Sequence, residues 1–277
     1  MPRSTTSVVT DRRRAVDRRR VGAVLGAELV CAVFLVAGPG DARSGPVLAE
    51  PTGFAATTMS SPAPATLTMP GGRSAMLIDL GAPSGHALLA RIAAELPAAA
   101  AAVSDFWGPQ WPRTVEIVVA GTAEQFAAVG AGDADTAATA TAERIMFSPA
   151  AAGMSPDDLR IVLRHELFHY AARPDTAADA PMWLTEGVAD YVARPPLISP
   201  TMPAVLPTDT ELMTPGPQRS AAYDRAWEFA SSVAETYGAD RLRELYLAAG
   251  GHGRRDLDTA VREVLGEDLA ALTAGPP

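Results

Sequence analysis

The segment HELFH at residues 165–169 places two histidines four positions apart. If this segment is helical, His165 and His169 lie on one face, so both imidazoles can bind a single metal ion. Glu166 stands next to the first histidine, where its carboxylate can take a proton from a metal-bound water. The chain has only four histidines. Two of them in one five-residue pattern favour a metal site over two incidental histidines on a helix.

A zinc site that performs chemistry has three protein ligands and keeps a fourth position open for water. The segment that follows, WLTEGVADY at residues 183–191, contains two carboxylates, Glu186 and Asp190, spaced by one helical turn. Further candidate third ligands lie outside this segment, and they are Asp175, Asp179, His86 and His252.

HELFH followed by WLTEGVADY resembles the gluzincin zinc metallopeptidases, the group that includes thermolysin and the M1-type aminopeptidases. The pattern in this sequence is most similar to that of the small bacterial peptidase MA-like proteins. The resemblance covers about residues 75–250. It implies that His165, His169 and Glu186 bind one Zn²⁺ ion. It also implies that Asp190 holds a ligand histidine through its second ring nitrogen, an arrangement common at metal sites.

The same resemblance implies an enzyme that hydrolyses peptide bonds in a peptide or protein substrate. Glu166 is then the general base for a zinc-activated water. Tyr223, which lies in the helical half, stabilises the oxyanion of the tetrahedral intermediate. The substrate would lie along an edge strand, for which residues 142–147 are the candidate. Gly187 would allow the two site helices to pack closely. The alternative function is a zinc-containing binding or structural module that cleaves nothing.

The elements that must position these residues follow from hydrophobic periodicity and helix-capping signals. We expect an α+β fold of the zincin-like kind, with a small N-terminal mixed sheet and helices, then a helical subdomain, and the active-site helix between them. Expected strands are 75–80, 114–120 and one or two within 136–148. Expected helices are 86–106, 122–129, 155–172, 181–193, 220–236, 239–249, 255–264 and 266–273. The Pro-rich segment 194–219 is either a surface connection or a lid.

The N-terminal part of the chain has the composition of a targeting segment. Seven Arg and two Asp give residues 1–20 a charge of +5, and the apolar run 21–38 follows. This pattern predicts a signal peptide or an uncleaved membrane anchor within residues 1–42. Residues 43–73 form an expected Pro/Ala/Thr-rich linker, and residues 74–277 the metallopeptidase domain. Both alternatives place that domain outside the cytoplasm, either secreted or held at the membrane through residues 21–38.

The composition of the chain argues against several other classes of function and site. The net charge is −9, so the chain beyond residue 20 carries −14, and every basic residue is Arg. A protein this acidic lacks the basic footprint of nucleic-acid binders, and no nucleic-acid partner is expected. The single cysteine excludes an intramolecular disulfide and a cysteine-based zinc site.

Overall fold

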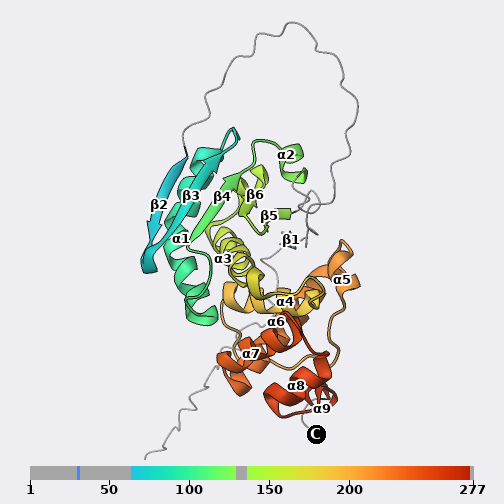
Figure 1. Cartoon of the computed structure of the whole chain (residues 1–277). Helices are drawn as coiled ribbons and strands as arrows, with labels where there is room; N and C mark the ends of the chain where they lie inside the picture. The colour runs from blue at the N-terminus through green and yellow to red at the C-terminus, as the bar shows by residue number, and fades with distance from the viewer. Residues whose placement is uncertain (1–29, 32–63, 129–135, 275–277) are drawn as a thin grey trace, which may run out of the picture.

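The computed structural model describes residues 30–31, 64–128 and 136–274 (Figure 1). Apart from residues 30–31, the expected signal peptide or anchor lies outside these residues, as does most of the expected linker. The described part is a mixed α/β fold in which a sheet with its covering helix precedes a mostly helical region. This order matches the expected sequence of a sheet half and a helical half.

The sheet is mixed, with strand order β1-β5-β6-β4-β3-β2. Strands β3, β4 and β6 run parallel to one another. β2 is antiparallel to β3, β5 is antiparallel to β6, and the two-residue β1 pairs parallel with β5. Their bounds are β1 Val30–Cys31, β2 Ala65–Met69, β3 Arg73–Asp79, β4 Thr114–Val119, β5 Thr136–Ala140 and β6 Arg144–Phe147.

The strand order corrects one expectation about substrate binding. Residues 142–147 were expected to offer a free strand edge, but β6 pairs with β4 on one side and with β5 on the other. Its backbone groups are therefore used within the sheet, and a peptide cannot add to it. Which strands lie side by side depends on long-range pairing, which a local pattern of alternating residues does not specify.

The β2–β3 hairpin corrects the expected start of the folded unit. β2 pairs along its whole length with β3, so residues 65–69 belong to the sheet and residues 70–72 connect the two strands, rather than forming a linker. Gly71 and Gly72 form the connection with φ values of 75° and 70°, a conformation that favours glycine. Two adjacent glycines between short β-prone runs are a hairpin signal, and this signal marks the hairpin in the sequence.

The helices follow the expected pattern closely, with bounds shifted by a few residues. A short helix, α5, also forms inside the expected Pro-rich connection, where the side chain of Thr208 and that of Glu211 make a reciprocal capping box. The helices are α1 Gly85–Trp107, α2 Ala123–Ala127, α3 Pro156–Ala172, α4 Met182–Ala193, α5 Asp209–Met213, α6 Pro217–Tyr237, α7 Ala239–Gly250, α8 Leu257–Leu265 and α9 Leu269–Thr273.

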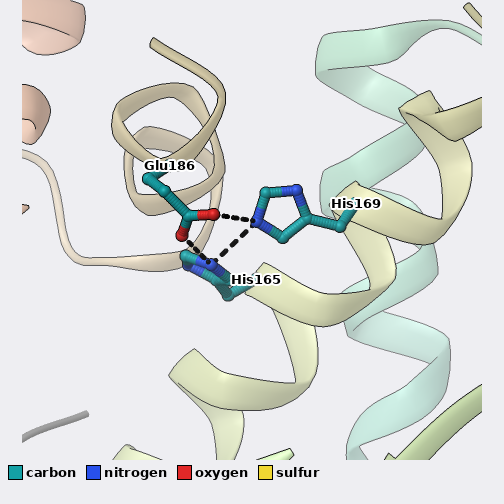
Figure 2. Close-up of side chains that lie close together, drawn as sticks. All are labelled: His165, His169 and Glu186. Atoms are coloured by element: carbon teal, nitrogen blue, oxygen red, sulfur yellow. Dashed lines mark hydrogen bonds and ion pairs between the residues drawn. The ribbon is translucent and has the colours of Figure 1, made fainter. Parts of the chain in front are cut away.

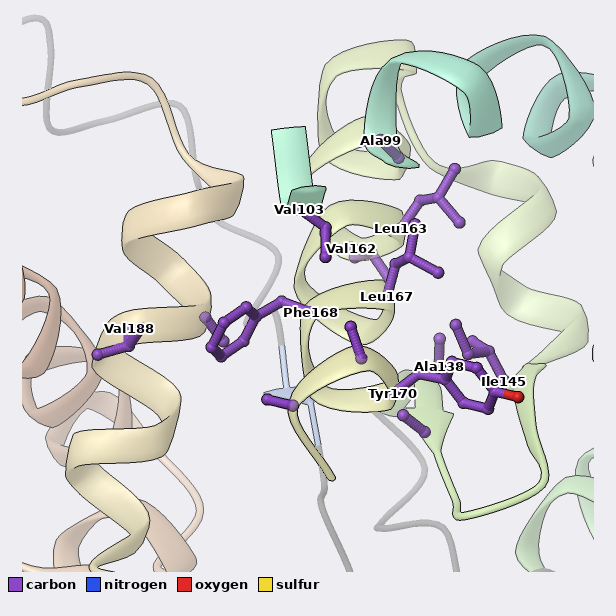
Figure 3. Close-up of a cluster of buried hydrophobic side chains, with 14 of the residues drawn as sticks. Ala99, Val103, Ala138, Ile145, Val162, Leu163, Leu167, Phe168, Tyr170 and Val188 are labelled. Atoms are coloured by element: carbon purple, nitrogen blue, oxygen red, sulfur yellow. The ribbon is translucent and has the colours of Figure 1, made fainter. Parts of the chain in front are cut away.

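Helix α3 lies between the sheet and the helical region (Figure 1). Figure 3 shows its apolar side chains on two sides: Leu163 and Leu167 point toward the sheet half, and Phe168 points toward α4. These three side chains are fully buried. Because each buried side chain of this size stabilises the fold by about 1.5–3 kcal/mol, the packing fixes α3 against both halves.

Among the described helices, α1 is long and apolar enough to cross a membrane by length and composition alone. Its residues Leu88, Ile92 and Leu96 are buried, and the helix packs against α3 and the sheet. The buried face explains its apolar composition, since a core helix of a folded domain has the same character.

Candidate metal centre

Helix α3 carries two of the site residues and begins at a strong cap. The side chain of Ser155 accepts a hydrogen bond from the backbone N–H of Asp158 at 3.1 Å, and Pro156 occupies the first turn. The helix continues unbroken to Ala172, so His165 and His169 lie one turn apart on its surface. The expected start of this helix at Ser155 is therefore confirmed.

The side chains of His165, His169 and Glu186 converge, two from α3 and one from α4 (Figure 2). The two Nε2 atoms are 3.0 Å apart, and the Glu186 carboxylate lies 3.1 Å from Nε2 of His165 and 3.4 Å from that of His169. Metal–ligand bonds of about 2.0–2.1 Å at tetrahedral angles place neighbouring ligand atoms about 3.3 Å apart. The three atoms thus have the spacing that a single metal ion requires.

The hydrogen bond to Asp190 fixes which nitrogen of His165 faces the cluster. Nδ1 of His165 lies 2.9 Å from Oδ1 of Asp190, and a carboxylate can only accept, so Nδ1 carries the hydrogen. When the ring is neutral, as a metal ligand must be, Nε2 presents a lone pair to the carboxylate of Glu186. Two acceptors 3.1 Å apart in a buried site repel each other unless a proton or a metal cation lies between them. This buried His-His-Glu group could therefore hold a metal ion.

An ion-pair chain supports the Asp190 carboxylate from its other side. Arg194 lies 2.7 Å from Oδ2 of Asp190 and 2.9 Å from Oδ1 of Asp224. Burial alone would lower the pKa of Arg194, but the negative charges of Asp190 and Asp224 together outweigh this effect and the pKa is raised. Asp190 is thereby held in one orientation, and with it the ring of His165.

Glu186 is suited to bind a cation at any ordinary pH. Burial alone would favour its neutral form, but His169 and His165 outweigh this and lower its pKa to about 2. Its side chain is 1% exposed, as is that of His165. Glu186 is therefore an ionised ligand in a site from which solvent is nearly excluded.

The other candidate third ligands lie apart from the cluster. Asp179 forms an ion pair with Arg254 at 2.7 Å, and Nε2 of His252 lies 3.1 Å from the carbonyl oxygen of Pro174. His86 and Asp175 are exposed. Asp190 contacts His165 but is not one of the three converging residues.

A cavity of about 230 Å³ lies beside the cluster on the His169 side. Its walls come from α3, the segment that follows it, α4, α5 and α7. Asp209 of α5 is one of the lining residues, so the Pro-rich connection contributes to the cavity wall. The lining residues are His169, Arg173, Thr176, Ala177, Ala178, Asp179, Ala180, Met182, Thr185, Asp209 and Tyr246.

Tyr246 is the cavity residue that sequence reasoning missed. Thr176 donates its hydroxyl hydrogen to the carbonyl of Ala172 at 2.9 Å, so the hydroxyl of Tyr246 donates to Thr176 Oγ1 at 2.8 Å. Burial raises the pKa of Tyr246, so it stays protonated and can act as a donor. The signal that could have found it is weak, because one tyrosine of a regular amphipathic helix looks like a core residue.

The two expected catalytic side chains, Glu166 and Tyr223, are both buried. Glu166 lies on α3 beside His165, and its charge is within electrostatic reach of the guanidinium of Arg173. Tyr223 lies on α6 and is not among the residues that line the cavity beside His169. The roles of both residues stay predictions.

Gly187 lies at a close contact between α4 and α6, rather than between the two helices that carry the metal cluster. A Cβ atom at Gly187 would lie 2.4 Å from the backbone oxygen of Ala226 and 2.7 Å from its carbonyl carbon. Backbone atoms cannot move aside cheaply, so only glycine permits this approach. The contact sets the position of α4, and therefore of Glu186, one residue away.

The chain matches none of the protein-family models, curated proteins or solved structures with which it was compared. The functional conclusion therefore depends on the geometry of the site.

Proposed function

We propose that this protein is a zinc-dependent peptidase that acts outside the cytoplasm. The observation that carries the proposal is the arrangement of three buried atoms or groups that can each bind a metal, Nε2 of His165, Nε2 of His169 and the carboxylate of Glu186, at 3.0–3.4 Å from one another. Such a group is costly without a cation and fits one metal ion. The cavity next to His169 gives room for a substrate beside the cluster.

Zinc is the metal that this ligand set favours. Two imidazoles and one carboxylate are a known ligand combination of catalytic zinc sites, which leave one position open. Ligands of only oxygen would favour Mg²⁺ or Ca²⁺ instead. The buried surroundings and the Asp190 hydrogen bond further fix the ring of His165 in the orientation that a metal ligand needs.

The mechanism assigns a separate task to each side chain. A bound zinc ion would supply Lewis-acid activation of water and polarisation of the scissile carbonyl. Glu166 would accept a proton at its carboxylate from the attacking water and pass it to the leaving amine. A tyrosine hydroxyl would donate a hydrogen bond to the oxyanion, either that of Tyr223 or that of Tyr246 once it gives up its hydrogen bond to Thr176. Of these two, Tyr246 lines the cavity that His169 also lines.

A second function, a zinc-containing binding or structural module, uses the same three ligands. The buried Glu166 beside His165 favours the enzyme, since a purely structural site has no use for a general base. The cavity beside His169 points the same way, because closed structural sites have four protein ligands and no open position.

Metal analysis combined with a peptide-library digest tests the proposal. We expect the wild-type protein to bind one zinc ion and to cleave peptides. Glu186→Ala should lose the metal, whereas Glu166→Gln should keep the metal and lose cleavage. His86→Ala, which removes an exposed histidine away from the cluster, is the matched control and should change neither.

Three outcomes are distinguishable. Zinc binding without any cleavage would support the non-catalytic module. Full cleavage by Glu166→Gln with zinc retained would remove the assigned role of Glu166. Wild-type protein that binds no zinc would contradict the metal centre itself.

A further inference from the structure

Arg173 is a cation in the wall of the cavity beside His169, and the proposed mechanism gives it no task. It follows the last residue of α3, four positions after His169, and its side chain is partly buried. In the part of the chain that the structure describes, Arg173 forms no ion pair with a carboxylate. A partly buried charge without a counter-ion costs free energy, and a ligand that brings a counter-ion removes that cost.

One nitrogen of this guanidinium is open to a ligand. Nη2 donates to the carbonyl oxygen of Ala140, the last residue of β5, at 2.9 Å, and this bond holds the side chain in place. Nε has no partner among the described residues and is shut off from solvent. Nη1 has no partner there either, but it is not among the inaccessible atoms. A group in the cavity can therefore meet Arg173 at Nη1.

The negative charge near Arg173 does not balance its positive charge. Burial lowers the pKa of the guanidinium, and the carboxylate of Glu166 raises it by less. Arginine nevertheless stays protonated in a protein, so the charge remains. Carboxylates are groups that guanidinium donors bind well, through hydrogen bonds that the opposite charges strengthen.

The two carboxylates that line this cavity are already engaged by other groups. Asp179 forms an ion pair with Arg254 at 2.7 Å. Oδ1 of Asp209 accepts a hydrogen bond from the backbone N–H of Trp183 at 3.2 Å, in the first turn of α4. The N-terminus of a helix carries a partial positive charge, which favours a carboxylate there. Both acids therefore leave the charge of Arg173 available to a ligand.

The cavity is small, and one of its walls is fixed. The segment that follows α3 is tied to the end of α7, because the N–H of Ala177 donates to the carbonyl oxygen of Gly250 at 2.8 Å. A β-bridge between Thr176 and Gly251 adds to this link. The volume of about 230 Å³ lies below the range of about 300–1,000 Å³ for sites that take drug-sized ligands. Such a space suits a short part of a substrate rather than a long segment.

We propose that Arg173 selects peptidase substrates that carry a carboxylate within about one or two residues of the scissile bond, with Nη1 donating to a carboxylate oxygen. The carboxylate is either the C-terminal α-carboxylate of the substrate or the side chain of an acidic residue. The word substrate rests on the proposed peptidase function. Binding of a carboxylate in the cavity does not require cleavage and is measured separately.

Calorimetric titration of the full-length, zinc-loaded protein tests carboxylate binding with three probes. N-acetyl-leucine carries an α-carboxylate, N-acetyl-leucinamide carries no charge, and N-acetyl-glutamic acid α-amide carries only a side-chain carboxylate. We expect at least one acid to bind about tenfold or more tightly than the neutral probe. The tighter of the two acids identifies which carboxylate the cavity takes. Two acids that bind no more tightly than N-acetyl-leucinamide would overturn the proposal.

Substitution of Arg173 separates its contribution from that of the metal, because a bound zinc ion also attracts carboxylates. Arg173→Gln should weaken binding of the preferred acid by about 10- to 100-fold, the loss of a hydrogen bond between charged groups. A preference for the acid that survives in this variant would come from the metal and would count against Arg173.

Arg164→Gln is the matched control for the change in charge. Arg164 lies on α3 and also forms no ion pair among the described residues, but it does not line the cavity. We expect this variant to bind all three probes as the wild-type protein does. Equal losses of acid binding in both variants would show that net charge, and not the position of Arg173, is responsible.

Cleavage assays separate substrate selection from an effect of Arg173 on Glu166, the proposed general base. Paired peptides carry the preferred carboxylate or its amide near the expected cleavage point. Arg173→Gln should lower kcat/KM for the acid peptide about 10- to 100-fold more than for the amide, mainly through KM. If Arg173 served only to keep Glu166 ionised, kcat would fall equally for both peptides, and the assigned selection would be wrong.

The two proposals fail in different ways. Acid binding through Arg173 without cleavage of any peptide would support this site and contradict the peptidase. Cleavage of acid and amide peptides at equal rates by the wild-type protein would support the peptidase and contradict the site. If Arg173→Gln does not fold, Arg173→Lys replaces it, since lysine keeps the charge but loses the fixed fork of donors. An acid preference in that variant equal to that of the wild type would also contradict the site.

Discussion

Asp190 Oδ1 and His165 Nδ1 lie 2.9 Å apart between two helices, and this contact determines the protonation of a residue that faces the metal cluster. Asp190 is not itself a member of the cluster. Its effect passes through the imidazole, because the hydrogen on Nδ1 leaves Nε2 free to bind a cation.

Replacing Asp190 by Asn should therefore weaken zinc binding by about 10- to 100-fold, the usual loss when such a supporting carboxylate is removed. Competition with a chromophoric chelator measures the dissociation constant. Asp224→Asn is the control, since Asp224 also contacts Arg194 but is largely exposed and does not touch a histidine. Equal losses in both variants would show that Arg194, and not the hydrogen bond to His165, is what matters.

Zinc affinity should fall as the pH falls from 7.5 to 5.5. The pKa of Glu186 is about 2, lowered from its ordinary 4.5, so this carboxylate stays ionised throughout that range. Its contribution to stability is fully present above pH 4.5 and is lost only as the pH falls toward 2. A metal binds the neutral imidazole, so protons compete with the metal for the two histidines.

The expected change is about tenfold in the apparent dissociation constant per pH unit for each proton displaced. Isothermal titration in two buffers of different ionisation enthalpy measures the released protons directly. A zinc affinity that is constant between pH 7.5 and 5.5, with no proton release, would contradict binding through the two imidazoles.

The local parts of this site could be predicted from the sequence, because they depend on helical spacing alone. His165 and His169 are four residues apart on a helix whose start is marked by Ser155 and Pro156. The convergence of Glu186 with them was predicted only through a resemblance, since nothing local in the chain says that α4 packs against α3. The geometry of the three side chains agrees with that expectation.

The parts that could not be predicted depend on contacts between distant segments. Tyr246 of α7 and Asp209 of α5 line the cavity beside His169, although they lie 77 and 40 residues after His169 in the chain. The interior position of β6 likewise results from pairing with β4 and β5. Alternating or amphipathic patterns identify an element but do not determine its neighbours.

Gly187→Ala should destabilise the protein through the contact between α4 and α6. The added Cβ would lie 2.4 Å from the carbonyl oxygen of Ala226, so the helices must separate. We expect the free energy of unfolding to fall by about 1–3 kcal/mol, as for other overpacked sites. Chemical denaturation measures the loss. Gly153→Ala is the control, because a Cβ added there would meet no atom within 4 Å, and a similar loss there would show that the contact is not the cause.

The two tyrosines can be separated by removing one hydroxyl at a time. Tyr246 lines the cavity beside His169 and donates to Thr176, whereas Tyr223 is buried on α6 and does not line that cavity. If the Tyr246 hydroxyl leaves Thr176 to donate its one hydrogen to the oxyanion, Tyr246→Phe should lower kcat by about 10²- to 10³-fold with little change in KM, the usual cost of one oxyanion donor. Tyr223→Phe should then leave kcat within a few-fold of wild type.

The reverse result would assign the oxyanion role to Tyr223, as the family resemblance implies, and would make Tyr246 a structural residue. Zinc content and melting temperature, measured on both variants, separate a catalytic loss from a structural one. A structural role for Tyr246 predicts a lower melting temperature and an unchanged kcat in the folded fraction, because loss of the bond to Thr176 removes about 1 kcal/mol of stability without touching the reacting atoms.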